Sequence, residues 1–263
     1  MRQGVRSARS ASIVDGWRLR AATSKSIMGS ITSVMTHENE HAKRIKGVRK
    51  APKDFIKFNS CTGDEYRVLS NFCEVPGGIQ WRGRHYPSAE HIYQMQLKAH
   101  PSCWHMFECG GKLGSLGSGF RAMGFADEEL KKKLKYWGPI KSSSRPCMVG
   151  IVAKMAINHP EWVEGLQLKP KPEKHFTDEE LVDIFKPILM AKWKCFRDFR
   201  VALMSVPRST VLIEFSRGAE RETRNGKAPR WTANVKDGYI YGENLCGRLM
   251  AMVRDEMLGE KQA

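Results

Sequence analysis

The sequence predicts an α+β fold that is mainly helical, a compact single domain with a few short strands. Three observations predict it. Short apolar runs separated by turn residues come first, helical periodicity takes over after Pro87, and one further strand-like run precedes a closing helix. The hydrophobic fraction of 41% and the charged fraction of 27% are typical of a folded, soluble chain, and 263 residues suffice for a sizeable core.

Residues 1–53 are predicted to form an arm outside this domain, which spans 54–263. The arm holds 12 Lys or Arg against 3 acidic residues, a surplus of +9 out of the chain's +16. Its first 35 residues are rich in Ser and Ala and have no long apolar block, so they fit an organellar transit peptide or, equally well, a disordered basic arm. The stretch that ends at Lys53 is typical of a solvated linker.

Strands are predicted where short apolar runs are bounded by Gly, Pro, Asn or Asp. The predicted strands are FIKF at 55–58, VLSNF at 68–72, the VPGGIQW run at 75–81 and TVLIEFS at 210–216. In the last of these, alternation places Glu214 on the face opposite Val211, Ile213 and Phe215.

Helices are predicted from apolar spacing and from residues that start or stop them. Ser88 is a good N-cap, and Thr177 with Glu180 supplies a capping box. The predicted helices begin after Pro87, span 126–137 and 146–158, form a short helix after Thr177, run on from about Pro187 to Leu203, and close the chain over 244–257.

Two segments are predicted to lack regular structure. A Pro- and Lys-rich linker at 166–176 lies inside a longer insertion at about 158–187, and a polar, arginine-rich loop spans 217–243.

The seven cysteines are odd in number and include no C-x-x-C pair, which indicates reduced thiols. A cluster of His and Cys at 100–109 fits no zinc spacing and is interpreted as a loop with buried thiols. No metal or other cofactor is therefore predicted. No run of about 18 apolar residues exists, so a membrane span is not predicted either.

The helix after Pro87 has two unlike faces on a helical wheel. One face is apolar and comprises Ile92, Met95 and Ala99. The opposite face carries a carboxylate, a phenol, an amide and a leucine, at Glu90, Tyr93, Gln94 and Leu97. Such a mixed face suits the wall of a ligand-sized cleft, whereas a purely structural account makes Glu90 a first-turn acid that the helix dipole holds ionised.

Several segments, in order, resemble the NADAR family, which is named for a predicted link to NAD and ADP-ribose. LSNF at 69–72 followed by YPSAEHIYQ at 86–94 resembles the family's paired signature. The resemblance continues through MAKW at 190–193, VLIEFS at 211–216, Trp231 and GENLCGRLMAMVR at 242–254. Two departures leave substrate choice open: a common family lysine falls on Leu97, and the segment near 158–187 is longer than in compact members.

The resemblance implies an N-glycosidase on a compact, mainly helical fold. Some members cleave ribosylamino-pyrimidine phosphates of riboflavin synthesis, and others remove ADP-ribose from guanine bases of nucleic acid. Both reactions build positive charge on a ribose ring, which a fixed carboxylate stabilises. Glu90 matches the family glutamate and is the expected catalytic carboxylate.

Lys192 is the second expected catalytic residue, and it should meet Glu90 around the pentose. Beside a buried stripe it could attack an opened ribose as a Schiff-base nucleophile or pair with a phosphate. The alternative is a lysine whose stem covers the apolar stripe while its amine reaches solvent.

Further residues are expected to bind substrate. They are Asn71, Phe72, Tyr86, Tyr93, Glu214, Trp231, Asn244, Arg217 and Arg230. Glu214 could bind ribose hydroxyls or face solvent, and Trp231 could stack on a base or fill the core. The two asparagines have simpler roles in a turn and a cap, and the arginines suit a pyrophosphate unless they are a solvated loop.

The leading hypothesis is a hydrolase of ADP-ribosyl-guanine in nucleic acid, ahead of one that acts on a phosphorylated ribosyl intermediate of riboflavin synthesis. The basic surface motivates that order. A rival hypothesis is a non-catalytic module that binds ADP-ribose or nucleic acid. We expect an intracellular protein, cytoplasmic or nuclear, or mitochondrial if residues 1–35 act as a transit peptide. The oligomeric state is not predicted.

Overall fold

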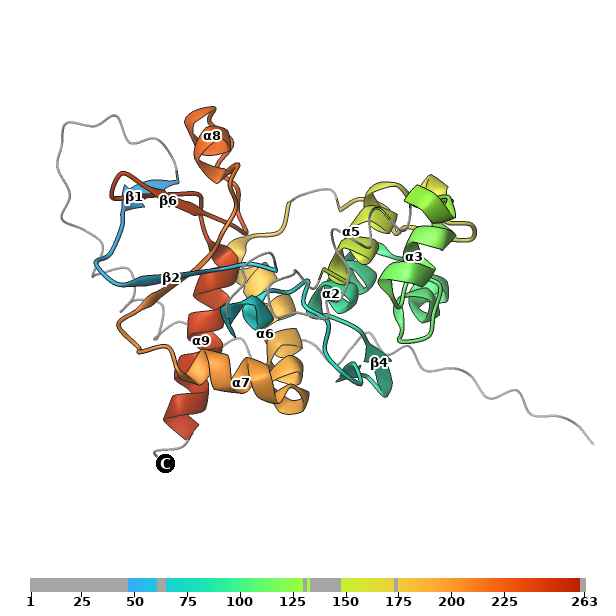
Figure 1. Cartoon of the computed structure of the whole chain (residues 1–263), viewed down its shortest axis with the longest axis horizontal. Coiled ribbons are helices and arrows are strands. Elements are labelled where there is room, and N and C mark those ends of the chain that lie inside the picture. Colours follow the sequence, from blue (N-terminus) through green and yellow to red (C-terminus); the bar gives the residue numbers. More distant parts are fainter. Residues whose placement is uncertain (1–46, 61–64, 130–131, 133–147, 173–174, 261–263) are drawn as a thin grey trace, which may run out of the picture. The chain divides into compact units, whose positions relative to one another are not determined.

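The computed structural model describes residues 47–60, 65–129, 132, 148–172 and 175–260. The chain divides into two compact units at residues 44 and 45, and all of the described residues belong to the second. Residues 1–46 of the predicted arm at 1–53 and most of the predicted helix at 126–137 lie outside them. The described part is a mixture of helices and short strands, so the α+β prediction is confirmed (Figure 1).

The strands form three small sheets. A three-stranded antiparallel sheet has the order β1 (Val48–Lys50), β7 (Tyr239–Tyr241), β6 (Asn234–Lys236). In the second sheet β2 (Phe55–Phe58) pairs in parallel with β5 (Val211–Glu214), so that Phe58 lies opposite Glu214. The third is a hairpin of β3 (Ile79–Trp81) and β4 (Arg84–Tyr86).

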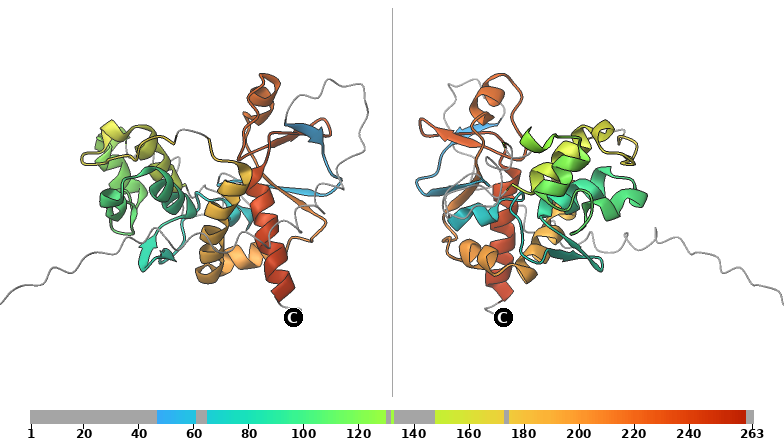
Figure 2. Two further views of the ribbon diagram at one scale, coloured as in Figure 1. Left: turned by 180° about the vertical axis from the view of Figure 1, so that it is seen from behind. Right: turned by 45° about the vertical axis from the view of Figure 1, so that its right-hand side comes forward.

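Most of the regular structure in the described chain is helical. The 3₁₀ segments are η3 (Glu65–Leu69), η4 (Pro101–Phe107) and η5 (Pro160–Trp162). The α-helices are α2 (Ala89–Lys98), α3 (Leu116–Ala122), α5 (Gly150–Asn158), α6 (Asp178–Cys195), α7 (Arg197–Met204), α8 (Ala219–Arg224) and α9 (Leu245–Glu260). Helices α2, α3 and α5 form one group, and α6, α7 and α9 form another that α2 joins through α6 (Figures 1 and 2).

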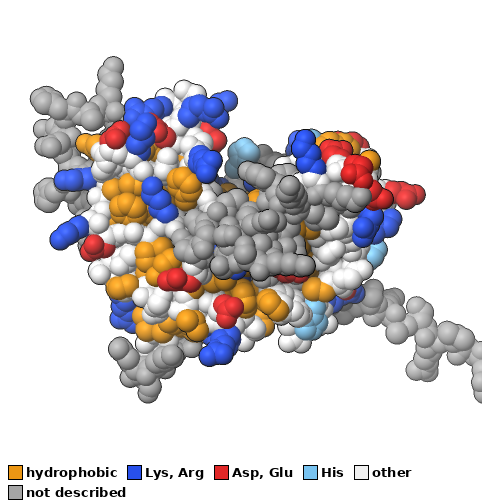
Figure 3. All heavy atoms as spheres, in the orientation of Figure 1, with side chains coloured by type: hydrophobic (Ala, Val, Ile, Leu, Met, Phe, Trp, Pro, Cys, Tyr) orange, Lys and Arg blue, Asp and Glu red, His pale blue; other side chains and the backbone are white. Residues whose placement is uncertain are grey.

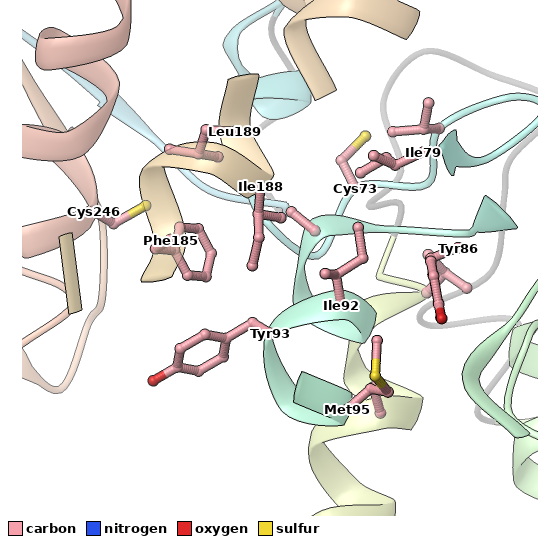
Figure 4. Packing of buried hydrophobic residues seen from close by; sticks show 14 of the residues in the cluster. Cys73, Ile79, Tyr86, Ile92, Tyr93, Met95, Phe185, Ile188, Leu189 and Cys246 are labelled. Atoms are coloured by element: carbon pink, nitrogen blue, oxygen red, sulfur yellow. The ribbon is translucent and has the colours of Figure 1, made fainter. Parts of the chain in front are cut away.

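Helix α2 lies at the centre of the main core. Every residue from Ala89 to Met95 is buried, including the polar ones. Tyr93 points to one side of the helix toward Phe185, whereas Tyr86 lies on the other side near Met95 (Figure 4). The prediction that only one face of this helix is apolar and buried, while the other lines a cleft, is therefore incomplete, because residues on both faces of α2 are buried.

Several local predictions are confirmed. The strands at 55–58 and 211–214 form, and Ser88 accepts a hydrogen bond from the backbone N–H of His91 as the N-cap of α2. The capping box of Thr177 and Glu180 is present. Helix α5 ends at the predicted His159, although it begins at Gly150 and not at residue 146.

Helix α6 corrects the prediction of two helices that meet near Pro187. It runs without interruption through Pro187, because the buried face of Leu181, Phe185 and Ile188 continues on both sides of the proline. It then ends earlier than predicted, at Cys195. Arg200 donates to the backbone carbonyls of Trp193 and Lys194. These carbonyls of the last turn of α6 therefore have hydrogen-bond partners although the helix stops, and α7 begins as a separate helix.

Three further predictions of local structure are wrong. The predicted strand at 68–72 is the end of η3 and a turn, because the carbonyls of Val68 and Ser70 accept from a side chain instead of a strand. Residues 48–50 of the predicted linker pair with β7. The predicted loop at 217–243 contains α8, β6 and β7.

Among the described residues, no group of three or more His, Cys, Asp and Glu side chains is placed to hold a metal ion. Over the same residues we find no helix whose length and hydropathy would let it span a bilayer. Within the described ranges, no disulfide forms between Cys73, Cys103, Cys109, Cys195 and Cys246.

Candidate active site

The start of α2 is held by a buried histidine. The Ser88 hydroxyl lies 2.8 Å from Nδ1 of His91, and Nε2 of His91 lies 2.9 Å from the carbonyl oxygen of Leu113. Burial lowers the pKa of His91 to about 4, so the imidazole is neutral, and its contact with a carbonyl places the proton on Nε2. His91 therefore anchors the helix and does not take part in proton transfer.

Glu90 lies in the first turn of α2 and is only 7% exposed. Nε2 of Gln94 donates to Oε1 of Glu90 over 2.7 Å. Burial raises the pKa of Glu90, while the Gln94 hydrogen bond and the charges of Lys154 and Lys98 lower it, in that order. Desolvation is thus the largest of these effects on the pKa of Glu90, and the expectation that its first-turn position holds it ionised stays a prediction.

Glu214 ends strand β5 and is also 7% exposed, so the alternative of a solvent-facing residue is wrong. The pKa of Glu214 is raised to about 7, mainly by burial and also by the negative charge of Glu90, against the lowering effects of Cys246, Lys154 and Lys192. The predicted alternation of β5 is confirmed, since Leu212 joins the main core and Ile213 a separate cluster.

Cys246 connects the carboxylate of Glu214 to the loop before α2. Its thiol is hydrogen-bonded to Glu214, and Nδ2 of Asn71 donates to its Sγ over 3.2 Å. Burial raises the pKa of Cys246 well above its ordinary value, so the thiol stays protonated and donates to the carboxylate. Cys246 reaches in from α9, on the Phe185 side of the core (Figure 4).

Lys192 is fully buried, so the alternative in which its amine reaches solvent is wrong. Its Nζ donates to the carbonyl oxygens of Val68 (2.7 Å) and Ser70 (2.8 Å) and lies 4.7 Å from the ring centroid of Phe199. The backbone N–H of Glu90 donates to the carbonyl of Asn71, the next residue after Ser70. Glu90 and Lys192 therefore approach the same turn of the chain from two helices.

Asn244 stands at the predicted cap position of α9, where its carbonyl accepts from the backbone N–H of Arg248, but its amide is not free for a substrate. Its Nδ2 donates to the carbonyl of Leu212 over 2.7 Å, and its Oδ1 accepts from the N–H of Glu214 over 3.0 Å. The side chain thus pairs with β5 as a neighbouring strand would. The backbone of Asn244 has a φ of 55°, a left-handed conformation that asparagine tolerates better than most residues.

Two buried amide oxygens beside the carboxylates lack a protein partner. Oδ1 of Asn71 and Oε1 of Gln94 have no hydrogen-bond partner among the residues that the structure describes. Both residues use their amide nitrogens, on Cys246 and Glu90 respectively. The two oxygens therefore have unused acceptor capacity beside the carboxylates.

Three aromatic rings form a cluster beside Glu90. The ring centroids of Tyr93 and Phe185 are 5.0 Å apart, and Trp231 lies 5.2 Å from Tyr93 and 5.3 Å from Phe185. Burial and the charge of Glu90 raise the pKa of Tyr93, so its hydroxyl stays protonated. Trp231 is only partly buried, which leaves part of its ring for contact with another molecule.

Helix α5 contributes two residues that the sequence did not single out. A Cβ on Gly150 would lie 2.7 Å from the Cα of Phe72 and 2.9 Å from the Cβ of Glu90, so only glycine permits this approach. One turn later, Nζ of Lys154 lies 5.6 Å from the ring centroid of Phe72, and its charge acts on both glutamates. An exposed lysine at a non-motif position carries no sequence signal of this role.

The arginines are less free than predicted. Nε of Arg230 donates to Asp178 over 2.6 Å, and its Nη1 donates to the carbonyl of Phe176. Arg224 pairs with Glu220 and Tyr241. Arg217 is exposed just before α8, a region where Lys and Arg side chains gather at the top of Figure 3.

Tyr86 does not join the other predicted residues. It is buried on the opposite side of α2 from Tyr93, as Figure 4 shows. The structure therefore gathers Glu90, Glu214, Lys192, Asn71 and Phe72 with the Tyr93 and Trp231 rings and leaves Tyr86 elsewhere.

Comparison with known proteins adds a fold likeness only. No protein-family model matches the chain, and no curated protein matches it. Among solved structures, it is similar to the NMR structure of the E. coli protein YbiA, with 18% sequence identity over 83% of this chain and 95% of that one, and a TM-score of 0.39.

Proposed function

We propose that this protein is an N-glycosidase, which hydrolyses the bond between C1′ of a ribose and a nitrogen. The observation that supports it is the pair of buried carboxylates, Glu90 on α2 and Glu214 on β5, which interact electrostatically and both have raised pKa values. Acid–base cleavage of a glycosidic bond needs two carboxyl groups in different environments, and burial raises the pKa of both of these, that of Glu214 to about 7.

The surroundings of the two carboxyl groups assign their roles. Glu214, with its pKa at about 7, is the acid that protonates the leaving nitrogen. Glu90 has a donated hydrogen bond from Gln94 and positive charge from Lys154, which favour its ionised form, so it stabilises the developing positive charge on the ribose. Glu90 then accepts the proton of the water whose oxygen bonds to C1′.

The polar atoms beside the carboxyl groups suit a ribosyl ligand. The unpaired amide oxygens of Asn71 and Gln94 can accept hydrogen bonds from ribose hydroxyls. Trp231, with Tyr93 behind it, offers a partly exposed ring against which a base can pack.

For the substrate we place ADP-ribosyl-guanine in nucleic acid first, because the chain carries a net charge of +16 and has the exposed Lys154 beside the carboxyl groups. The second candidate is a phosphorylated ribosylamino-pyrimidine. The ion pairs that hold Arg230 and Arg224 favour it, since they leave fewer cations for a pyrophosphate.

Incubation with each substrate, followed by mass spectrometry of the products, tests the proposal. We expect free ADP-ribose from ADP-ribosylated DNA, and a loss of rate of about 10²- to 10⁴-fold in Glu90→Gln. Glu164→Gln, which changes an exposed glutamate, is the matched control. An unaltered rate in Glu90→Gln would remove the role of Glu90, and ligand binding without product from either substrate would favour a binding module.

Lys192 is assigned a positioning role in this proposal. Its two hydrogen bonds to Val68 and Ser70 fix the turn that carries Asn71, and they hold the amine in place as a donor. We therefore expect no enzyme–sugar adduct when borohydride is added during turnover. A trapped adduct on Lys192 would show that it is a Schiff-base nucleophile instead.

A further inference from the structure

A pocket of about 180 Å³ lies beside α2, on the side where Tyr86 and Met95 are found. It is lined by three aromatic side chains, two arginines, a methionine and an amide, namely Trp81, Tyr86, Trp104, Arg82, Arg84, Met95 and Gln96. Apart from Tyr86, none of these residues was expected to bind a ligand, and none belongs to the carboxylate cluster.

The β3–β4 hairpin brings most of the lining together. Arg82 and Gly83 form its turn with φ values of 50° and 77°, which lets Trp81 pair with Arg84 across the hairpin. The guanidinium of Arg82 lies 5.8 Å from the ring centroid of Trp81, and Arg84 forms an ion pair with Glu108. The pocket therefore has an aromatic wall with cationic groups next to it.

Two of the residues that line the pocket, Trp81 and Gln96, each carry a buried polar atom without a partner in the described part of the chain. Nε1 of Trp81 and Oε1 of Gln96 are buried and have no hydrogen-bond partner among the described residues. Buried polar atoms are nearly always paired, so this combination indicates a molecule that accepts one hydrogen bond and donates another.

Positive charge is concentrated at this pocket. Nζ of Lys169 donates to the backbone carbonyl of Gln96 over 2.6 Å and lies 5.7 Å from the ring centroid of Trp104. Burial and the neighbouring charge of Arg82 lower the pKa of Lys169. An anionic group on a ligand would relieve the repulsion between these cations.

The size of the pocket limits its occupant to one ring system. A cavity of about 150 Å³ holds benzene, whereas larger ligands need about 300 Å³ or more. A flat heteroaromatic ring that carries a donor and an acceptor on its edge and is joined to an anion fits the volume of the pocket, its two unpaired polar atoms and its positive charge. A nucleobase with its phosphate has these properties.

We propose that this pocket binds the base of a nucleotide, with the phosphate near Arg82. The ligand has two possible sources, a free mononucleotide or an unstacked base in a single strand. The pocket does not depend on the hydrolase activity, because it uses different residues.

Calorimetric titration of the full chain with AMP tests this proposal. We expect AMP to bind, and ribose 5-phosphate and inorganic phosphate to bind far more weakly, because they lack the ring. An oligodeoxyadenylate that binds more tightly than AMP identifies a single strand as the ligand, and one that binds no better identifies the free nucleotide. Equal affinity for AMP and ribose 5-phosphate would overturn the proposal.

Conservative variants locate the binding. Trp81→Phe and Gln96→Leu remove the unused donor and acceptor, so each should weaken AMP binding about five- to 150-fold without lowering the thermal midpoint. Arg82→Asn, which tolerates the turn conformation, should weaken binding of AMP in a salt-dependent way. Trp162→Phe, at an exposed tryptophan, is the control.

A catalytic-site variant separates this proposal from the hydrolase. Glu90→Gln should bind AMP as the wild type does, even if no glycosidase activity is ever found. If Glu90→Gln abolishes AMP binding while Trp81→Phe and Gln96→Leu leave it unchanged, the nucleotide lies at the carboxylates and the pocket proposal is wrong.

Discussion

The two sides of α2 bury polar groups of different kinds. On one side Glu90 shares its surroundings with Glu214, Lys192 and Lys154, so burial there changes proton equilibria. On the other side the buried polar atoms are an indole N–H and an amide oxygen, which carry no charge. Buried ionisable groups provide acid–base chemistry, whereas buried neutral groups provide recognition. The difference separates the proposed site of reaction from the proposed binding pocket.

The largest expected effect concerns Lys192, on the charged side. Lys192→Met keeps the length of the side chain but leaves the carbonyls of Val68 and Ser70 without their donor. We expect the free energy of unfolding to fall by about 2–5 kcal/mol, measured by urea denaturation. Lys194→Met, at an exposed position of the same helix, should change stability little. Equal effects of the two variants would contradict the buried role of Lys192.

The pH dependence of the free energy of unfolding tests whether burial raises the pKa of Glu214. Its folded pKa of about 7 exceeds the ordinary value of 4.5, so it contributes stability below pH 4.5 that is lost as the pH rises through 7. The loss is about 3 kcal/mol at 1.36 kcal/mol per pKa unit. Glu214→Gln stays neutral, so relative to wild type it should gain stability between pH 5 and pH 8, measured by urea denaturation.

The same titration sets the pH dependence of catalysis. Because Glu214 must be protonated to act as the acid, kcat/KM should fall above pH about 7 in the wild type. A rate that keeps rising above pH 8 would show that Glu214 is not the acid. Binding of AMP in the pocket on the other side of α2 should not change as Glu214 titrates.

The smallest expected effect concerns the packing that holds Glu90. In Gly150→Ala the new Cβ would press on Phe72 and Glu90, so we expect a loss of about 1–3 kcal/mol in stability, with reduced activity. In Gly117→Ala the nearest atom is 3.6 Å away, and the higher helix propensity of alanine should stabilise α3 slightly. If both variants gain stability, the close approach of α5 to Glu90 is not required.

Local signals in the sequence predicted local structure well. The Ser88 cap, the Thr177 capping box and strand β5 follow from a few neighbouring residues, and they form as predicted. The sequence did not predict that α6 continues through Pro187, because the continuation depends on burial of one long helix face against the rest of the fold. The predicted strand at 68–72 failed for a similar reason, since Lys192, more than 120 residues away, binds its carbonyls.

The sequence by itself determined the α+β class, the caps of α2 and α6, and the presence of acidic and amino groups on elements that could form a site. Only the tertiary structure decided that Glu90 and Glu214 share one environment, that Cys246 donates to it, and that Tyr86 faces another pocket. Caps and strands depend on contacts between near neighbours in the chain. Proton affinity and pocket shape depend on desolvation and charge from residues brought together by folding, which no local pattern records.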